Sequence, residues 1–412
     1  MQKVKLKDLC IGKGEYGIAA AAEPFSKEKI RYLRITDISN FGELLFADCK
    51  SISCKGCEQY LLRENDIVFA RTGNSTGRSF FYEKKYGPLV YAGFLIKFHI
   101  DKNKVNPKYL KYFTISNTYK KWVSSFQGGS TRGNLSEGDY SNMPVYLPSR
   151  EIQDSLVSIM DSLAEKISIN NAIISELESV AKDIYDYWFV QFDFPDASGQ
   201  PYRSSGGKMV WNEELKREIP EGWKVAKLSD YLNNLNETIS SPVGYENLFY
   251  TPIDCLPMKR MSFYGGLPAS EASTSLQLYH KNSILIGAMR VYFHRVCLAS
   301  HDGITRSTTM VLAPKKGEKE LGYWYEVLND DLTVEYATRR SVGTQQPYIN
   351  WTNGLEQFEF PTPSSPELRE LYSKRIELII RKAQTAAQEN WELKSLRDWL
   401  LPMLMNGQVK VG

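Results

Sequence analysis

The feature that most constrains the fold is a repeat that spans nearly the whole chain. The matched segments, first copy before second, are VKLKDL (4–9) and AKLSDYL (226–232), NDIVFARTG (65–73) and NSILIGAMR (282–290), AGFLIKF (92–98) and STTMVLA (307–313), the Gly-Ser-Thr turn (129–131) and Gly343 with Thr344, and LPSREI (147–152) and PTPSSPEL (361–368). Each match is weak alone, but all keep the same order along the chain. The sequence therefore predicts two copies of one structural unit.

Each copy ends in a stretch that predicts a long helix. Apolar side chains recur every three or four residues over about 150–189, and the same face returns 216 residues later, over about 365–401. The predicted face consists of Leu156, Met160, Leu163, Ile167, Asn170, Ile174, Leu177, Ala181, Ile184 and Trp188, and then of Leu368, Tyr372, Ile376, Ile379, Ala383, Ala386, Asn390, Leu393, Arg397, Leu400 and Leu404. A stripe of this length, with small or polar residues inside it, is typical of a seam between two helices. Separate packing of each helix on its own domain is the alternative.

The roughly 150 residues before each helix predict a mixed α/β domain with many short strands. Strand-like segments are IRYLRITDI (30–38), NDIVFART (65–72), LVYAGFLIKFHI (89–100) and MPVYLP (143–148), and short helices are expected at NPKYLKYFTIS (106–116) and GYWYEVLND (322–330). The Gly, Ser and Pro content of residues 191–223 predicts a connector into the second copy.

Composition agrees with a folded chain in two domains. The 412 residues are 42% hydrophobic, 24% charged and 12% aromatic, which excludes a disordered or collagen-like protein. The N-terminal segment MQKVKLKDLC has no apolar signal core, and no run is long enough for a membrane span, so we expect a cytoplasmic protein without membrane contact. The six cysteines are expected to be reduced thiols.

Charge is distributed unevenly along the chain. Residues 1–150 hold 24 Lys and Arg against 14 Asp and Glu, a net charge of +10, whereas residues 151–198 hold 2 against 10, a net −8. Residues 364–412 hold 8 against 6, a net +2, so the two predicted helices have charges of opposite sign. The basic first block favours a polyanionic partner, although a solvated basic face would give the same count.

With these features in view, the whole chain resembles the specificity subunit of type I restriction-modification systems. The resemblance depends on the doubled architecture, the connector with its WFVQFDFP, GGKMVWN and IPEGW segments, the LPS entry to the first long helix, and the ending LLPMLMNGQV. It implies an α/β fold with two pseudo-symmetric target recognition domains separated by two long helices that form an antiparallel coiled coil. It also implies a non-catalytic protein that recruits two adenine-specific methyltransferase subunits and, in some systems, two ATP-driven restriction subunits.

On this basis we expect residues 1–149 to form the first DNA target recognition domain, 150–190 a central helix, 191–223 the connector, 224–363 the second recognition domain, and 364–412 a C-terminal helix. Each domain would recognise one half of a bipartite double-stranded DNA site, and the helices would set the spacer and dock the methyltransferases. Two alternatives stay open at this point: a structural adaptor whose repeated domains bind proteins, and a specificity subunit of a related DNA-methylation defence system.

Motifs for catalysis are absent from the sequence. The chain contains no P-loop, no Asn-Pro-Pro-Tyr or Asp-Pro-Pro-Tyr segment and no HExxH, which disfavours a self-sufficient methyltransferase. S-adenosylmethionine and ATP are therefore expected on partner subunits, and no cofactor on this chain. Cys49, Cys54 and Cys57 form a C-x4-C-x2-C pattern, but no fourth ligand lies nearby, and we expect no metal site.

Candidate DNA-binding side chains occur on glycine-bounded loops. Arg and Lys suit phosphates, whereas Arg, Asn, Gln, Ser, Thr and Tyr suit base edges. In the first copy the candidates are Arg71, Asn74, Ser75, Thr76, Arg78, Gln127, Ser130, Thr131, Arg132 and Asn134. In the second copy they are Arg290, Tyr292, Arg295, Arg306, Ser307, Thr308, Gln345, Gln346, Tyr348 and Asn350. The recurrence of such loops at matching places in both copies supports the assignment.

Overall fold

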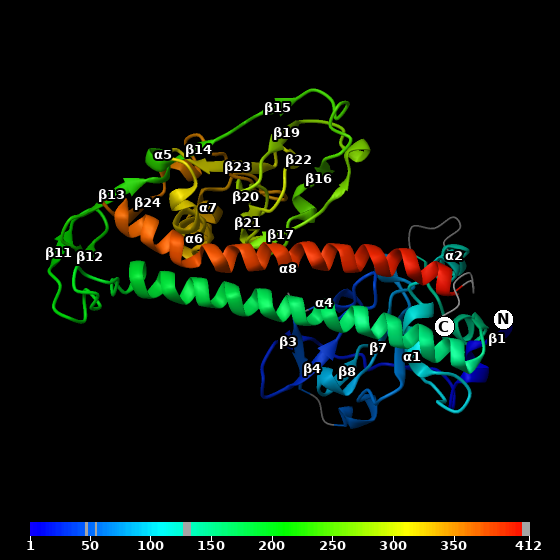
Figure 1. Ribbon diagram of the computed structural model, residues 1–412. Helices are drawn as coiled ribbons and strands as arrows, with labels where there is room; N and C mark the ends of the chain where they lie inside the picture. The colour runs from blue at the N-terminus through cyan, green and yellow to red at the C-terminus, as the bar shows by residue number, and fades with distance from the viewer. Residues whose placement is uncertain (46–47, 54–55, 127–132, 406–412) are drawn as a thin grey trace. The chain divides into compact units, whose positions relative to one another are not determined.

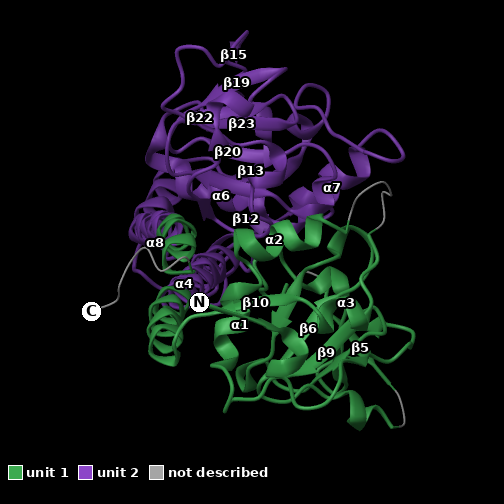
Figure 2. Cartoon of the chain, turned by 90° about the vertical axis from the view of Figure 1, so that its right-hand side faces the viewer, with its two compact units in different colours: residues 1–165, 394–412 green, residues 166–393 purple. Residues whose placement is uncertain are grey.

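The computed structural model describes residues 1–45, 48–53, 56–126 and 133–405. The chain divides into two compact units: unit 1 comprises residues 1–165 and 394–412, and unit 2 comprises residues 166–393 (Figure 2). Each unit contains a mixed α/β domain and a stretch of both long helices. The predicted α/β fold class, with two domains and a long helix between them in the chain, is confirmed.

Unit 1 is built on short strands and three short helices. One sheet has the order β2 (Glu15–Tyr16), β9 (Leu95–His99), β6 (Asp66–Ala70) and β7 (Ser79–Phe81), and another has β3 (Glu23–Pro24), β5 (Lys50–Ile52), β4 (Ile30–Leu33) and β8 (Leu89–Tyr91). Strand β1 (Gln2–Lys5) pairs with β10 (Pro144–Leu147). The helices are α1 (Pro107–Phe113), α2 (Asn117–Ser124) and α3 (Glu137–Ser141).

Strand β6 is the central strand of unit 1, and all five of its residues are buried. Ile67 and Phe69 belong to one hydrophobic cluster, whereas Val68 and Ala70 belong to another. Alternate side chains of a strand point to opposite faces, so β6 is covered on both sides. This double cover explains why its sequence is a continuous apolar run rather than an alternating one.

Unit 2 repeats this plan with more strands. One sheet has the order β14 (Leu232–Asn234), β23 (Thr309–Pro314), β20 (Ile284–Gly287), β21 (Val296–Ala299) and β17 (Ser262–Phe263), and another has β15 (Thr238–Ile239), β19 (Leu276–Tyr279), β22 (Gly303–Arg306), β16 (Phe249–Tyr250) and β18 (Leu267–Pro268). Strand β13 (Trp223–Lys227) pairs with β24 (Glu359–Pro363). The helices are α5 (Leu228–Tyr231), α6 (Leu321–Asn329) and α7 (Asp331–Arg340).

The strands that carry the repeated sequences occupy equivalent positions in the two units. Strand β6 lies between β9 and β7, and β20 lies between β23 and β21. An asparagine with positive φ stands just before each central strand, Asn65 at 74° and Asn282 at 68°. Strand β20 is also covered on both faces, because Ile284 and Ile286 join one cluster and Leu285 another.

The two long helices are α4 (Arg150–Tyr185), which ends in a π-helical turn at Asp186–Val190, and α8 (Glu367–Met405), shown in Figure 1. Every residue of the two predicted apolar faces is buried or half-buried. The second apolar stretch was followed to about residue 401, and α8 continues beyond it through Pro402 to Met405. No helix in the described part of the chain is long and apolar enough to cross a membrane.

Contacts within each unit show that α4 and α8 run antiparallel. In unit 2, Nδ2 of Asn170 donates to Oε2 of Glu389 at 2.8 Å, and the hydroxyl of Tyr372 donates to the carbonyl of Ala181 at 2.9 Å. In unit 1, the start of α4 shares a hydrophobic cluster with the end of α8, through Leu156 and Leu404. The predicted helix–helix seam is therefore present.

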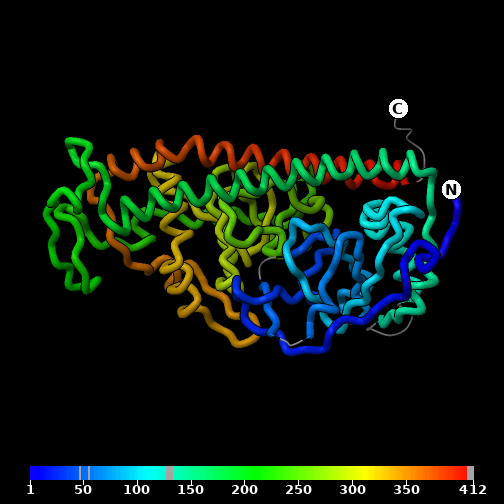
Figure 3. The backbone as a smooth tube through the Cα atoms, turned by 90° about the horizontal axis from the view of Figure 1, so that it is seen from below, coloured from blue at the N-terminus to red at the C-terminus, as the bar shows by residue number. Residues whose placement is uncertain are grey.

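The connector is more ordered than its Gly, Ser and Pro content predicts. It carries the hairpin β11 (Met209–Asn212) and β12 (Arg217–Pro220) beyond the end of α4, as Figures 1 and 3 show. The carboxylate of Asp193 accepts hydrogen bonds from the backbone N–H and the hydroxyl of Ser204, at 2.7 and 2.6 Å. The ring of Phe194 stacks on Trp223 with 5.5 Å between centroids. The segment is thus a packed part of unit 2.

Two local expectations were wrong. The segment 30–38 was expected to be strand-like throughout, but β4 ends at Leu33 and a 3-10 turn follows at Ile35–Asp37, where the Asp37 carboxylate accepts from the N–H and guanidinium of Arg34. The expectation of reduced thiols was wrong for Cys57, which is disulfide-bonded. Cys10, Cys255 and Cys297 are free thiols.

Candidate nucleic-acid interface

In unit 1 the predicted loop 71–78 connects the central strand β6 to β7. Two backbone hydrogen bonds close the loop. The N–H of Ala70 donates to the carbonyl of Arg78 at 2.8 Å, and the N–H of Gly77 donates to the carbonyl of Ala70 at 3.0 Å. Gly77 has a φ of 87°, and a Cβ there would lie 2.6 Å from a methyl of Val123. Only glycine fits both the left-handed backbone and this close approach. The loop is therefore a rigid turn.

The two arginines of this loop have different environments. The guanidinium of Arg71 lies 5.1 Å from the centre of the exposed Tyr16 ring, in a cation–π contact. Arg78 donates from Nη1 to the carbonyl of Ile38 at 2.9 Å. Both side chains are half-buried. Arg78 is thus tied to the backbone of its own domain, whereas Arg71 rests on an aromatic ring at the surface.

The polar residues between these arginines also fall into two groups. Ser75 and Thr76 are buried, and the Thr76 hydroxyl lies within hydrogen-bond distance of the carbonyls of Gly73 (2.8 Å) and Gly133 (2.9 Å). The side chains of Asn74 and Asn134 are exposed. Thr76 therefore holds the loop in place, and the two asparagines are available to a ligand.

The second predicted loop of unit 1 reaches the first one. Thr72 forms an antiparallel bridge with Asn134, and the N–H of Leu135 donates to the carbonyl of Arg71 at 2.9 Å. The predicted residues Gln127, Ser130, Thr131 and Arg132 lie outside the described residues, so their role stays a prediction. The contacts at 134 and 135 bring both predicted segments of unit 1 to the same end of strand β6.

Unit 2 repeats this arrangement after strand β20. Met289 bridges to Tyr348, as Thr72 bridges to Asn134 in unit 1. Arg290, whose φ is 52°, donates from its N–H to the carbonyl of Pro347 at 2.7 Å and from Nη2 to that of Gln345 at 3.2 Å. The two predicted loops of unit 2 therefore also meet, at the matching end of the central strand.

Other candidates of unit 2 differ in how far they are exposed. The ring of Tyr292 is 51% exposed and packs edge-to-face on Phe293 with 4.9 Å between centroids. The guanidinium of Arg295 donates to the carbonyl of Leu256 and lies over the ring of Phe293. Gln345 and Gln346 are exposed. Arg295 is tied to its own domain as Arg78 is, and Tyr292 and the two glutamines are accessible.

The turn 306–308 joins the same cluster of loops. The N–H of Ala288 donates to the carbonyl of Thr308, and the N–H of Ser307 to that of Ser275, both at 2.9 Å. Nη2 of Arg306 donates to the hydroxyl of Thr274 at 3.1 Å. A cleft of about 540 Å³ opens beside this turn. Ser307, Tyr348 and Asn350, all predicted from sequence, line it.

Sequence reasoning missed several residues at these places. Tyr16, Asn234, Gln277 and Thr309 belong to strands that neighbour the predicted loops, and the last three line the 540 Å³ cleft. Thr309 directly follows the predicted Ser307 and Thr308, which was the one available signal. Among the described residues, no group of three or more His, Cys, Asp or Glu side chains could hold a metal ion.

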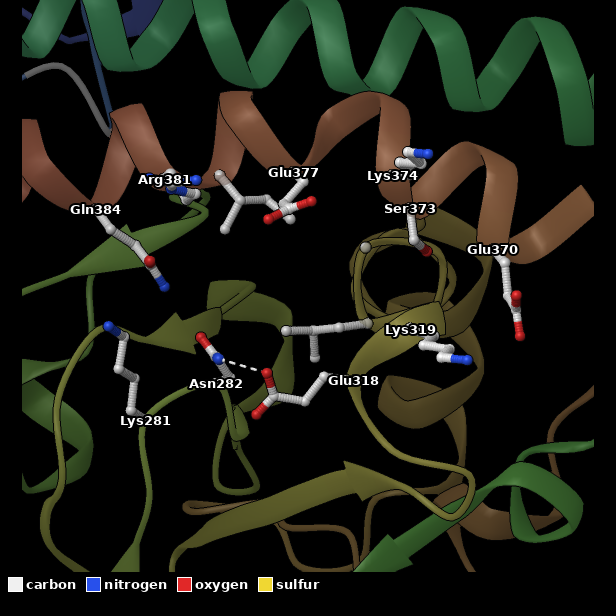
Figure 4. Close-up of a pocket in the computed structure, with 13 residues that line it drawn as sticks. Lys281, Asn282, Glu318, Lys319, Glu370, Ser373, Lys374, Glu377, Arg381 and Gln384 are labelled. Carbon is white, nitrogen blue, oxygen red and sulfur yellow. Dashed lines mark hydrogen bonds between the residues drawn. The ribbon is translucent and has the colours of Figure 1, made fainter.

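A second cleft of unit 2, of about 600 Å³, lies beside α8 and has a different character. Seven of its thirteen described lining residues are charged, and Figure 4 shows Glu370 and Gln384 on the α8 side and Lys281 and Glu318 opposite. Nδ2 of Asn282 donates to Oε2 of Glu318 at 2.8 Å. A cleft lined by charges of both signs suits contact with the surface of another protein.

Comparisons with known proteins point to one family. Residues 1–179 match the model of the type I restriction modification DNA specificity domain. The chain is 24% identical to the type I restriction enzyme MjaIX specificity subunit of Methanocaldococcus jannaschii, over 76% of this chain and 71% of that protein. It is 22% identical to the type I restriction enzyme HindI specificity subunit of Haemophilus influenzae, over 90% of this chain and 93% of that protein. A crystal structure of the type I restriction-modification S subunit from M. genitalium aligns with 98% of this chain and over 95% of its own length, at 15% identity and a TM-score of 0.51. The two chains therefore have the same fold.

Proposed function

We propose that this chain, which belongs to the family of type I restriction-modification specificity subunits, recognises the two halves of a bipartite double-stranded DNA target, one with each unit. The observation that carries the proposal is the duplication of the loop cluster. In each unit the loop after the central strand is bridged to a later polar segment, through Thr72 and Asn134 or through Met289 and Tyr348. Two similar binding surfaces in one chain suit a target with two parts.

The chemistry of the clusters supports DNA as the ligand. Arg71 and Arg290 supply positive charge, and Asn74, Asn134 and Tyr292 supply exposed side chains that can contact bases or sugars. The net charge of +10 over residues 1–150 favours the approach of a polyanion. Rigid turns carry these groups, so less conformational entropy is lost on binding.

Catalysis is proposed to come from partner subunits. We expect two adenine methyltransferase subunits, with S-adenosylmethionine bound to them, and in some assemblies two restriction subunits that use ATP. The complex would act in the cytoplasm. This chain would contribute target choice and assembly.

The outer faces of the long helices are the proposed docking surface for the methyltransferases. In unit 2, Ile169, Ile173 and Val180 of α4 are between 44% and 48% exposed and lie on one helix face, at spacings of four and seven residues. On α8, Leu371 and Leu378 are exposed seven residues apart. Apolar side chains aligned on an exposed helix face are typical of a protein interface. The same helices would set the spacer between the DNA half-sites.

Methylation mapping tests the proposal directly. The full chain is produced together with an adenine methyltransferase subunit of a type I system that forms a complex with it, in a host without adenine methylation, and methylated positions are mapped by sequencing. We expect one bipartite motif. Exchange of residues 1–149 for those of a relative should change one half of the motif and leave the other half intact. Absence of a motif, a continuous motif, or a change in both halves would contradict the proposal.

A binding measurement separates DNA recognition from a purely structural adaptor. The purified full-length chain, without methyltransferase subunits, is titrated with duplexes that contain the motif at low and moderate salt. Because phosphate contacts release counterions, affinity should fall steeply as salt rises. An adaptor that binds only proteins would show no binding to the duplex at either salt concentration.

A further inference from the structure

Glu178 of α4 connects the long helix to an irregular segment of the unit 2 domain. Its Oε1 accepts from the N–H of Met261 at 2.6 Å, and its Oε2 accepts from Nη1 of Arg260 at 3.1 Å. The side chain of Glu178 is only 18% exposed. Removal of a carboxylate from water is costly, and two donors offset that cost. The contact therefore fixes one end of residues 256–261, the linking segment of unit 2, to α4.

The same linking segment contacts the loop 290–295, which carries predicted DNA-binding residues. The N–H of Lys259 donates to the carbonyl of His294 at 2.8 Å, and the guanidinium of Arg295 donates to the carbonyl of Leu256. The linking segment belongs to no helix or strand of the described chain, so contacts of this kind determine its position. Helix α4 is thus connected to the loop through a few hydrogen bonds.

The backbone of this loop depends on such contacts because it is strained. Arg290 and His294 stand on either side of a 3-10 turn, and each has a φ of 52°. Side chains with a Cβ rarely adopt this left-handed conformation, and it persists only where the surrounding structure holds it. The bond from Lys259 to the carbonyl of His294 is one contact that holds it. A displaced linking segment would therefore displace the loop.

Unit 1 contains an equivalent connection, made with α8. In the loop 71–78, Nη1 of Arg78 donates to the carbonyl of Ile38 at 2.9 Å. Ile38 begins residues 38–43, the linking segment of unit 1. The buried guanidinium of Arg397, on α8, lies 4.6 Å from the centre of the Phe41 ring in that segment. A long helix, a linking segment and a predicted DNA-binding loop are therefore connected in unit 1 as well.

The two connections follow the repeat. The separations along the chain are 217 residues for Arg78 and Arg295, 218 for Ile38 and Leu256, and 219 for Glu178 and Arg397. All three are close to the offset of 216 residues between the repeated helix faces. The connection is thus part of the duplicated plan. Its helix residue is a carboxylate in unit 2 and a guanidinium in unit 1.

We propose that Glu178 and Arg397 are positioning residues for DNA recognition, each of which holds the DNA-binding loop of its unit through the linking segment; the inference rests on the proposed function. Neither side chain needs to touch DNA. Helix α4 follows the first domain in the chain and positions the loop of the second. Helix α8 follows the second domain and positions the loop of the first. Each half-site therefore depends on a different helix.

The test measures which half-site each helix residue affects. The full chain, as wild type, Glu178→Ala or Arg397→Ala, is titrated with the motif duplex and with two duplexes in which one half-site is scrambled. The exchange of residues 1–149 assigns each half-site to its unit. Glu178→Ala should weaken binding to the intact motif by roughly two- to 30-fold. The loss should remain when the unit 1 half-site is scrambled and disappear when the unit 2 half-site is scrambled. Arg397→Ala should show the reverse pattern.

Matched variants control for changes elsewhere on the helices. Glu176→Ala on α4 and Lys394→Ala on α8 change exposed residues and should bind all three duplexes as the wild type does. Glu178→Gln keeps an oxygen that can accept from the N–H of Met261, so it should recover most of the affinity. Any loss that remains in Glu178→Gln should also be confined to the unit 2 half-site. This variant keeps the test decisive if Glu178→Ala does not fold, which its Tm will show.

The pattern across the duplexes separates a positioning role from a purely structural one. Folded variants that bind the motif as the wild type does, that lose affinity equally for all three duplexes, or that affect the opposite half-site would overturn the inference alone. A lower Tm without a loss confined to one half-site would also overturn it. A wild type that binds the motif and the scrambled duplexes equally would instead overturn the proposed function, and this inference with it.

Discussion

The hydroxyl of Tyr372 on α8 donates to the backbone carbonyl of Ala181 on α4, with 2.9 Å between the two oxygens. Both residues are 0% exposed. The Tyr372 ring also packs edge-to-face against Phe189 and Trp188, at centroid distances of 5.4 and 5.9 Å. This contact ties the end of α4 to the start of α8 inside the core of unit 2, and it fixes the register of the helix pair there.

Tyr372→Phe removes this hydrogen bond and keeps the ring. We expect unit 2 to lose about 1 kcal/mol of unfolding free energy, measured by urea denaturation, since a buried carbonyl loses one of its donors. Tyr336→Phe is a suitable control, because the hydroxyl of that half-buried residue makes no hydrogen bond within the described part of the chain. Equal stability of the two variants would show that the Tyr372 hydroxyl contributes nothing to the seam.

Arg71 and Arg78 should have separable roles, although they stand in one loop. Arg71→Ala should weaken DNA binding by roughly 1–3 kcal/mol if it contacts a base, and relax one position of the unit 1 half-site. Arg78→Ala should instead lower the Tm, because the carbonyl of Ile38 loses its donor. Site selection and thermal unfolding of both variants check this. A pair of variants with the same phenotype would contradict the division.

Much of the fold follows from sequence patterns, whereas the roles of single site residues do not. The repeat located the equivalent strands β6 and β20, because covered central strands keep a recognisable apolar run. The offset of 216 residues makes Ala386 the equivalent of Asn170, yet Asn170 contacts Glu389. A repeat relates equivalent positions, and contact partners in an antiparallel pair depend on how the helices meet.

The same limit applies to the candidate interface. Arg71 and Arg78 look alike in sequence, and their difference depends on Tyr16 and Ile38, which lie 40 or more residues away. Likewise, Asn234 at the 540 Å³ cleft belongs to a strand whose position beside β23 no local pattern predicts. Composition was enough to select the loops. It does not predict the tertiary contacts that distinguish a structural side chain from an accessible one.

Glu326 of α6 should make the stability of unit 2 depend on pH. Burial raises the pKa of this carboxyl to about 8, against the opposing effect of Lys182. In the unfolded chain the group titrates near its ordinary pKa of about 4.3, so its stabilising effect is complete below that value and is lost as pH rises to about 8. The loss is of the order of several kcal/mol. Asp330, whose pKa burial also raises, adds a contribution of the same sign.

Urea denaturation between pH 5 and 8 measures this effect. The wild type should become less stable as pH rises, and Glu326→Gln should be less sensitive to pH, because the amide does not titrate. Glu335→Gln, at an exposed residue of α7 whose carboxylate pairs with Arg339, serves as the control and should keep the wild-type dependence. A Glu326→Gln variant with the full wild-type slope would show that another group is responsible.

Helix length should determine the DNA spacer. At 1.5 Å per residue, the 36 residues of α4 span about 54 Å and the 39 residues of α8 about 58 Å. Four residues inserted after Asn170 add about 6 Å and turn the apolar face by only about 40°. Because Asn170 contacts Glu389, the matching insertion belongs after Glu389. Antiparallel helices must lengthen together to keep their seams in contact, so the double insertion should be better tolerated than either single one.

The complex of the double-insertion protein with methyltransferase subunits should therefore methylate a motif whose spacer is one or two base pairs longer, since each added pair extends DNA by about 3.4 Å. Both half-sites should keep their sequences, because the loops at Arg71 and Arg290 are untouched. The single insertions serve as controls and should lower the Tm more than the double one does, because each leaves one helix face without its partner. Methylation mapping of all three proteins decides the question: an unchanged spacer in a folded double variant would mean that something other than α4 and α8 sets the distance between the half-sites.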